Sequence, residues 1–140
     1  MRLILDTNIL VSALIKKSLT WEILIHPEIE YVVSEFVFEE IELNKQEILR
    51  KSELSEEEFE ILFENLKDRL IFMPDEKIMH KDKALKVMHK IDINDSIFIA
   101  LALSTENDGI WSQDKHFELQ NIVKVWKTKD IVNYLSIHHE

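Results

Sequence analysis

The strand-to-helix step that sets the fold class lies at the start of the chain, in the stretch RLILDTNILVSALI (residues 2–15). Residues 2–5 are a short apolar run ended by Asp6, a pattern typical of a buried strand. From Thr7 onward apolar side chains recur at helical spacing, which predicts a helix directly after the strand. Such a step is the repeating unit of α/β domains.

The same alternation continues along the chain. Four further apolar or β-branched runs predict strands: residues 30–34, 70–73, 110–112 and 123–126. Strands that alternate with helical patterns favour an α/β domain with a parallel sheet. No linker divides the chain, so we expect a single domain over residues 1–140.

The helical patterns differ in the face that they would bury. Amphipathic or apolar spacing predicts helices at residues 19–25, 34–48, 55–70, 77–90, 92–103 and 129–135. Ser34 is the expected N-cap of one long helix with Val37, Ile41 and Ile48 on one face, and Ser55 is the expected N-cap of another. The pattern at 92–103 is apolar on every side, which predicts a helix buried on all sides.

Composition and charge exclude several classes of protein. The chain has 17 basic and 27 acidic residues, a formal net charge of −10, one glycine and no cysteine. A single glycine excludes the phosphate-binding loops that need several, and the lack of cysteine excludes disulfides, thiolate metal sites and thiol nucleophiles. The acidic balance argues against a grip on nucleic acid or membrane by bulk positive charge. Asp6 and Asn8 interrupt the first apolar run, so we expect no signal peptide, no membrane association and a cytoplasmic protein.

Five carboxylates fall where a parallel sheet would bring them together. Asp6 and Asp114 follow predicted strands, and catalytic groups of open parallel sheets gather at the carboxyl ends of strands. Asp92 and Asp95 open the apolar helix, and Glu40 lies at the edge of the apolar face of its helix. Converging carboxylates repel one another unless cations lie between them, and Mg²⁺ or Mn²⁺ prefers such oxygen ligands. Two ions about 3.5–4 Å apart would suit phosphodiester cleavage, one activating water and the other stabilising the leaving oxygen.

Each carboxylate also has a purely structural interpretation. Asp6 and Asp92 stand where helix N-caps are expected, and Asp114 stands where a turn is expected. Glu40, in a glutamate-rich stretch, would be a solvated helix position. The joint placement of these residues, more than any one of them, predicts a site.

Four motifs in order resemble those of the PIN-domain nucleases: LILDTNILVSAL (3–14), VSEFVFEEIE (33–42), DINDSIFIALAL (92–103) and IWSQDKHF (110–117). The resemblance runs from Arg2 to about Leu135. It implies a three-layer α/β/α sandwich with a central, mostly parallel sheet. It implies a metal-binding set of five carboxylates: Asp6, Glu40, Asp92, Asp95 and Asp114. Within this set it implies a supporting role for Asp92, which it shares with Asn8 and Ser112.

The resemblance also implies an activity. It points to a ribonuclease that uses Mg²⁺ or Mn²⁺, with single-stranded RNA as substrate and Asp6, Glu40, Asp95 and Asp114 as the catalytic residues. Many small family members are VapC-type toxins, which implies an antitoxin partner and a homodimer. Gln113 departs from the family pattern, in which a basic or small residue is common.

Other interpretations stay open. The main alternative is a non-catalytic or regulatory PIN module that binds RNA or a partner protein. A dehalogenase-type phosphatase would need a second aspartate at position 8, which is Asn8, and a receiver domain would need a phosphoacceptor aspartate on its third strand. The six histidines are expected on the surface, and the basic stretch 77–90 is either a solvated face or a surface that steers RNA.

Overall fold

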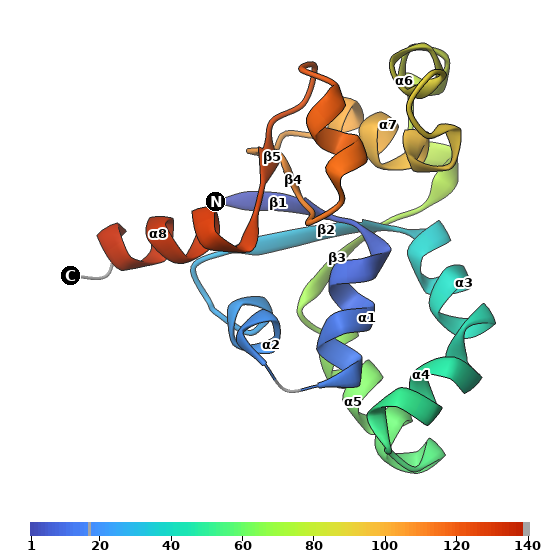
Figure 1. The fold of residues 1–140 in the computed structure, drawn as a ribbon, viewed down its shortest axis with the longest axis vertical. Coiled ribbons are helices and arrows are strands. Elements are labelled where there is room, and N and C mark those ends of the chain that lie inside the picture. Colours follow the sequence, from blue (N-terminus) through green and yellow to red (C-terminus); the bar gives the residue numbers. More distant parts are fainter. Residues whose placement is uncertain (17, 139–140) are drawn as a thin grey trace.

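A five-stranded sheet forms the centre of the computed structural model, which describes residues 1–16 and 18–138 (Figure 1). All strand pairs are parallel. In spatial order the strands are β3 (Leu70–Met73), β2 (Glu30–Ser34), β1 (Arg2–Leu5), β4 (Ile110–Trp111) and β5 (Val125–Trp126). The chain therefore winds outward from β1 in both directions, and the strand order reverses between β1 and β4. In open α/β sheets the crevice at the carboxyl ends of such a strand pair is where ligands bind.

Helices cover both faces of this sheet. They are α1 (Thr7–Ile15), α2 (Leu19–Leu24), α3 (Glu35–Leu43), α4 (Lys45–Ser52), α5 (Glu56–Lys67), α6 (Lys81–Met88), α7 (Ser96–Ser104) and α8 (Thr128–His138). Figure 1 shows α1 to α5 on one side of the sheet and α6 and α7 on the other. The predicted three-layer α/β/α sandwich is confirmed. Within the described residues, no helix is both long and apolar enough to cross a membrane.

The core lies on both faces of the sheet, against α7 on one side and against α1, α3 and α5 on the other. The three apolar residues of β1, Leu3 to Leu5, are fully buried. The residues of α7 from Phe98 to Ala102 are also buried. Trp111 is also fully buried, and its indole N–H donates to Thr128 Oγ1 at 3.1 Å. Burial on this scale is the main source of stability, because each large apolar side chain contributes about 1.5–3 kcal/mol.

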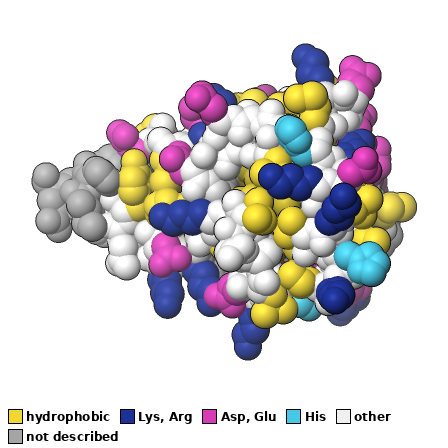
Figure 2. All heavy atoms as spheres, turned by 90° about the horizontal axis from the view of Figure 1, so that it is seen from above, with side chains coloured by type: hydrophobic (Ala, Val, Ile, Leu, Met, Phe, Trp, Pro, Cys, Tyr) yellow, Lys and Arg dark blue, Asp and Glu magenta, His cyan; other side chains and the backbone are white. Residues whose placement is uncertain are grey.

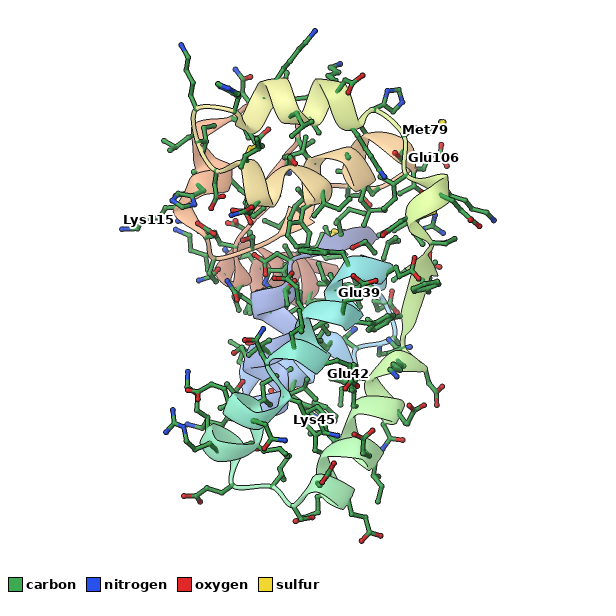
Figure 3. All side chains as sticks on the ribbon, turned by 90° about the vertical axis from the view of Figure 1, so that its right-hand side faces the viewer. Glu39, Glu42, Lys45, Met79, Glu106 and Lys115 are labelled. Atoms are coloured by element: carbon green, nitrogen blue, oxygen red, sulfur yellow. The ribbon has the colours of Figure 1, made fainter. Side chains whose placement is uncertain are left out.

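The predicted long helix after β2 is two helices instead. It breaks at Asn44, whose side-chain Nδ2 donates to the Glu40 carbonyl oxygen at 2.8 Å and so closes the end of α3. Lys45 then begins α4 and ties it to α5 by ion pairs of 3.0 and 2.6 Å with Glu56 and Glu60. Figure 3 shows Glu39 and Glu42 on the outer face of α3 and Lys45 below them.

Capping follows the prediction at one serine and departs from it at the other. Ser55 caps α5 as predicted, in a capping box in which its hydroxyl accepts from Glu58 N–H while the Glu58 carboxylate accepts from Ser55 N–H. Ser34 makes no side-chain cap bond, and its hydroxyl is buried without a hydrogen-bond partner.

The predicted basic helix over residues 77–90 is shorter than expected. Residues Asp75–Lys77 form the 3-10 turn η1, and His80 adopts a left-handed backbone with φ 62°, so α6 begins only at Lys81. A second short turn, η2 (Ile93–Asp95), precedes α7, and a third, η3 (Lys115–Leu119), follows β4.

Candidate metal centre

A buried serine joins the carboxyl ends of β1 and β4. Asp6 follows β1 and is 4% exposed, and its Oδ1 accepts from the Ile9 N–H at 3.0 Å, which caps α1. Its Oδ2 accepts from the Ser112 hydroxyl, across 106 residues of chain. The Ser112 oxygen in turn accepts from the Asp114 backbone N–H at 3.0 Å. Ser112 therefore sets the position of Asp6 and of Asp114 relative to each other.

The same aspartates both cap helical turns and belong to the candidate site. Asp92 Oδ1 accepts from Asn94 N–H at 3.0 Å and caps η2, and Asp114 Oδ1 accepts from His116 N–H at 2.9 Å and caps η3. Like Asp6, each uses one carboxylate oxygen for the cap. The cap orients the carboxylate and keeps its second oxygen outside the cap.

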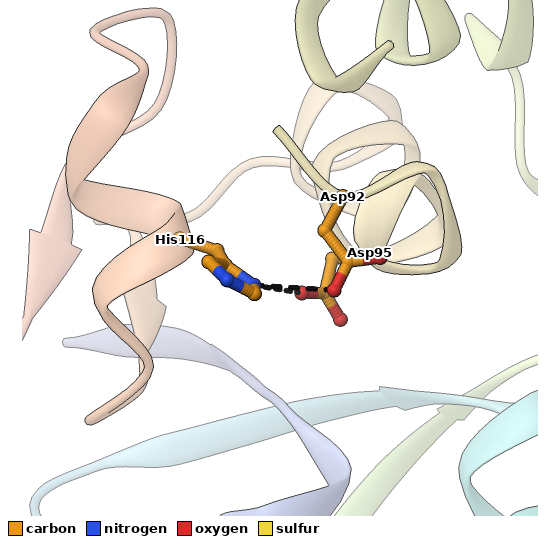
Figure 4. Close-up of side chains that lie close together, drawn as sticks. All are labelled: Asp92, Asp95 and His116. Atoms are coloured by element: carbon orange, nitrogen blue, oxygen red, sulfur yellow. Dashed lines mark hydrogen bonds and ion pairs between the residues drawn. The ribbon is translucent and has the colours of Figure 1, made fainter. Parts of the chain in front are cut away.

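A histidine joins the acidic residues. Figure 4 shows the His116 ring facing Asp92 and Asp95, and one donor atom from each of these three residues lies within 4.8 Å of the other two. His116 Nδ1 is 3.1 Å from Asp92 Oδ2, 3.8 Å from Asp95 Oδ2 and 3.5 Å from Asp114 Oδ1. His116 lies on the surface, as the sequence predicts for the histidines, but the sequence prediction gave this residue no role in the site. Its position two residues after Asp114 was the available signal, because any fold that brings Asp114 to the site brings His116 with it.

Burial and mutual repulsion disfavour the charged form of these carboxylates. Burial raises the pKa of Asp95 to about 7, and the charge on Asp92 and then Asp114 adds to the increase. Burial also raises the pKa of Asp6, against the lowering effect of its hydrogen bond from Ser112. Asp95 Oδ2 is buried and lacks a hydrogen-bond partner. A hard divalent cation fits this set, because it takes oxygen ligands and offsets their negative charge.

Glu40 and Asn8 lie at the margin of the group. Glu40 Oε1 accepts from the Thr7 hydroxyl, so α3 is tied to the residue next to Asp6. Asn8 is exposed and lines a pocket of about 320 Å³ together with Asp6 and Asp114. Like Asp6 and Asp114, both residues lie outside the tight cluster of donor atoms that Asp92, Asp95 and His116 form among the described residues. Gln113, the departure from the family pattern, has a structural task there, since its Oε1 accepts from Thr128 N–H at 2.9 Å.

A larger pocket, of about 730 Å³, lies at the opposite end of the sheet. Three of its charged residues, Arg2, Glu30 and Asp108, are already engaged in structural contacts. The Arg2 guanidinium lies 3.5 Å from Glu30, and Asp108 Oδ2 accepts from the Arg2 backbone N–H at 2.9 Å. The aspartates and His116 therefore lie at the carboxyl ends of the strands and not in this larger pocket.

Comparison with known proteins assigns a family. No curated protein matches the chain. The family profile described as PIN domain matches residues 4–136, which include all five carboxylates of the predicted metal-binding set. PIN domains are generally nucleases and usually use divalent metal ions. The chain belongs to the PIN-domain family.

Proposed function

We propose that the protein is an endoribonuclease that depends on Mg²⁺ or Mn²⁺ and cleaves single-stranded RNA. The observation that carries this proposal is the convergence of four aspartates where the strand order reverses: Asp6, Asp92, Asp95 and Asp114. Family membership supports a nuclease, and the excess of buried negative charge supports a divalent cofactor.

The aspartates and Glu40 would hold the metal, and Ser112 would position them. When bound, the metal supplies the positive charge that activates water and stabilises the departing oxygen of the phosphodiester. Asp6 is held by both of its oxygens, so it offers a rigid ligand. Asp95 must lose its proton before it can bind a cation, which its pKa of about 7 makes possible near neutrality. Asn8, at the pocket, would donate a hydrogen bond to the scissile phosphate.

The lysines of α6 would steer RNA toward the centre. This helix packs against α7 and against η2, the turn that carries Asp95. Figure 2 looks down onto this side of the molecule and shows lysine side chains among hydrophobic ones. Lys86 and Lys90 line a shallow pocket there with Leu85 and Ile91. Lysines beside apolar side chains suit a flexible strand, because they contact phosphates without reading sequence.

We further propose that the ribonuclease is the toxin of a toxin–antitoxin pair and forms a homodimer, as the resemblance to VapC-type proteins implies. Production of the wild type in a bacterium is then expected to arrest growth, whereas production of Asp6→Asn is not. Light scattering of the purified protein should give twice the mass of one chain. Normal growth with an active nuclease would contradict the toxin role alone.

Cleavage of a labelled single-stranded RNA tests the central proposal. Asp6→Asn is expected to lower the metal-dependent rate by about 100-fold or more, because it removes a ligand charge. Asn can still accept the Ile9 N–H bond, so the fold should persist. The exposed Asp68→Asn is the matched control and should cleave like the wild type.

Three outcomes separate the alternatives. Cleavage by the wild type that is lost with a chelator and in Asp6→Asn supports the ribonuclease. Equal cleavage by wild type and Asp6→Asn would contradict it. Binding of Mn²⁺ or RNA by the wild type without any cleavage would favour the non-catalytic PIN module.

A further inference from the structure

We propose that His116 is a nitrogen ligand of the metal centre and that it makes the centre prefer Mn²⁺ over Mg²⁺. This inference rests on the metal centre of the proposed function. It adds to the acidic set a residue of different chemistry, which neither composition nor the family motifs singled out. It also addresses the choice between the two cations.

The separations between donor atoms are those of ligands around one ion. Two donors about 2.1 Å from the same cation lie about 3 Å apart at right angles and about 4.2 Å apart on opposite sides. His116 Nδ1 lies 3.1 Å from Asp92 Oδ2, 3.5 Å from Asp114 Oδ1 and 3.8 Å from Asp95 Oδ2. All three separations fall between these limits, and Asp92, Asp95 and His116 each offer a donor atom within 4.8 Å of the other two, so these three side chains can share one cation.

The fold holds the ring in this position. Phe117, the next residue, is fully buried and packs edge-on against Phe98 of α7, with 6.0 Å between ring centroids and an interplanar angle of 82°. The His116 backbone N–H also donates to Asp114 Oδ1. Because Asp95 lies at the start of α7, this packing fixes η3 against the helix that bears Asp95. His116 therefore faces the carboxylates as a result of core packing and not of a chance surface contact.

An imidazole changes which ion the centre prefers. Mg²⁺ takes oxygen ligands almost exclusively. Affinity for a site that includes nitrogen rises along the first transition series, which begins with Mn²⁺, so an imidazole beside the carboxylates favours Mn²⁺ over Mg²⁺. Among the described residues, His116 is the histidine that forms a cluster of possible metal ligands, with Asp92 and Asp95. His89, which is exposed at the C-terminal end of α6, serves as a control.

The test is Mn²⁺ binding at one equivalent, followed by calorimetry and by pulsed electron paramagnetic resonance. We expect the wild type to show ¹⁴N coupling from a coordinated imidazole, and His116→Ala and His116→Gln to lack it. Both variants should weaken Mn²⁺ binding by about tenfold while Mg²⁺ binding changes by less than about twofold. His116→Gln keeps a side-chain N–H for Asp92 and so separates a ligand from a mere hydrogen-bond donor. His89→Ala should match the wild type.

The outcomes distinguish this inference from the proposed function. Mn²⁺ binding without nitrogen coupling in the wild type would overturn the ligand role and leave the ribonuclease intact. Coupling that persists in His116→Ala would assign the nitrogen to another histidine and also overturn the inference. Absence of Mn²⁺ and Mg²⁺ binding altogether would contradict the metal centre itself. A thermal melt of each variant confirms that it is folded, which is expected because the His116 side chain is 48% exposed.

Discussion

Single carboxylates in this molecule serve two purposes. Asp6, Asp92 and Asp114 each cap a helical turn with one oxygen, and the turn in exchange fixes the direction of the second oxygen. Asparagine caps helices about as well as aspartate. Substitution by asparagine therefore removes the charge and keeps the scaffold, which makes it the informative change at these positions.

The raised pKa of Asp95 predicts a pH-dependent stability of the metal-free protein. Its pKa is about 7 in the folded state against an ordinary value of 3.8, so the folded state binds the proton more tightly. The stability from this group is full below pH 3.8 and is lost as pH rises through about 7. Asp95→Asn should reduce this fall, and the part that remains is expected from Asp6, whose pKa is also raised. Urea unfolding in a chelator at about pH 5 and about pH 8 measures the fall in unfolding free energy. An unchanged fall in Asp95→Asn would contradict the assignment of this effect to Asp95. Asp68→Asn is the control.

Gly109 is a position where no other residue fits. Its φ is +136°, and an added Cβ would press on the Lys124 carbonyl oxygen and lie 2.9 Å from Trp126 Cδ1. Gly109→Ala is expected to lower the free energy of unfolding by about 2–3 kcal/mol, through backbone strain and the clash with β5. Urea denaturation measures the change. The exposed Glu106→Ala, in the same connection, should stay within about 0.5 kcal/mol of the wild type, and equal stability of both variants would show that the β4–β5 pair tolerates the side chain.

At the scale of elements, the sequence predicts the existence of strands and helices better than their ends. The five strands and the apolar helix α7 follow from local patterns of apolar residues. The break at Asn44 does not, because Val37, Ile41 and Ile48 keep helical spacing across it and are buried in either arrangement. The break is set by packing of α4 on α1 and by the ion pairs of Lys45 with α5.

The start of α6 escaped prediction for a related reason. His80 takes a left-handed backbone, which is uncommon outside glycine, although histidine adopts it more often than most residues. That conformation is imposed by contacts distant in the chain, such as the Ser104 hydroxyl, which accepts from the neighbouring Met79 N–H at 2.7 Å. Contacts of this kind become visible only once α7 is placed.

The capping box of α5 gives a prediction at this scale. Ser55→Ala removes the acceptor of the Glu58 N–H at the start of the helix and should cost about 1 kcal/mol of unfolding free energy. The exposed Ser136→Ala, inside α8, makes the same chemical change without a cap and should be close to neutral. Chemical denaturation of the two variants side by side makes the comparison. Equal stability would mean that α5 is held by packing alone.

At the scale of the molecule, the structure shows where part of the net charge of −10 lies. Part of it is concentrated where β1 and β4 end, and a site of this kind was predictable because parallel strands align their carboxyl ends. The positions of Asp6, Asp95 and Asp114 could be expected on that ground. The contribution of His116 could not, since it depends on how η3 packs against α7.

Metal binding should therefore stabilise the whole fold. A ligand present at 100 times its Kd adds about 2.7 kcal/mol, which corresponds to a rise in Tm of about 5–10 °C for a domain of this size. Adding Mn²⁺ to chelator-treated protein should give such a rise, and Asp6→Asn and Asp95→Asn should reduce it. Differential scanning calorimetry measures Tm. An equal rise in the wild type and both variants would place the metal elsewhere on the surface.

The hydrogen bond between Ser112 and Asp6 also determines at which stage of chain synthesis the centre can form. Its two partners are 106 residues apart, so a growing polypeptide on the ribosome cannot complete the centre until β4 has emerged and docked beside β1. Closing so long a loop comes late and depends on the intervening elements being in place. A nascent or truncated chain that lacks β4 therefore lacks the complete set of carboxylates, and any activity of this centre has to wait until β4 pairs with β1.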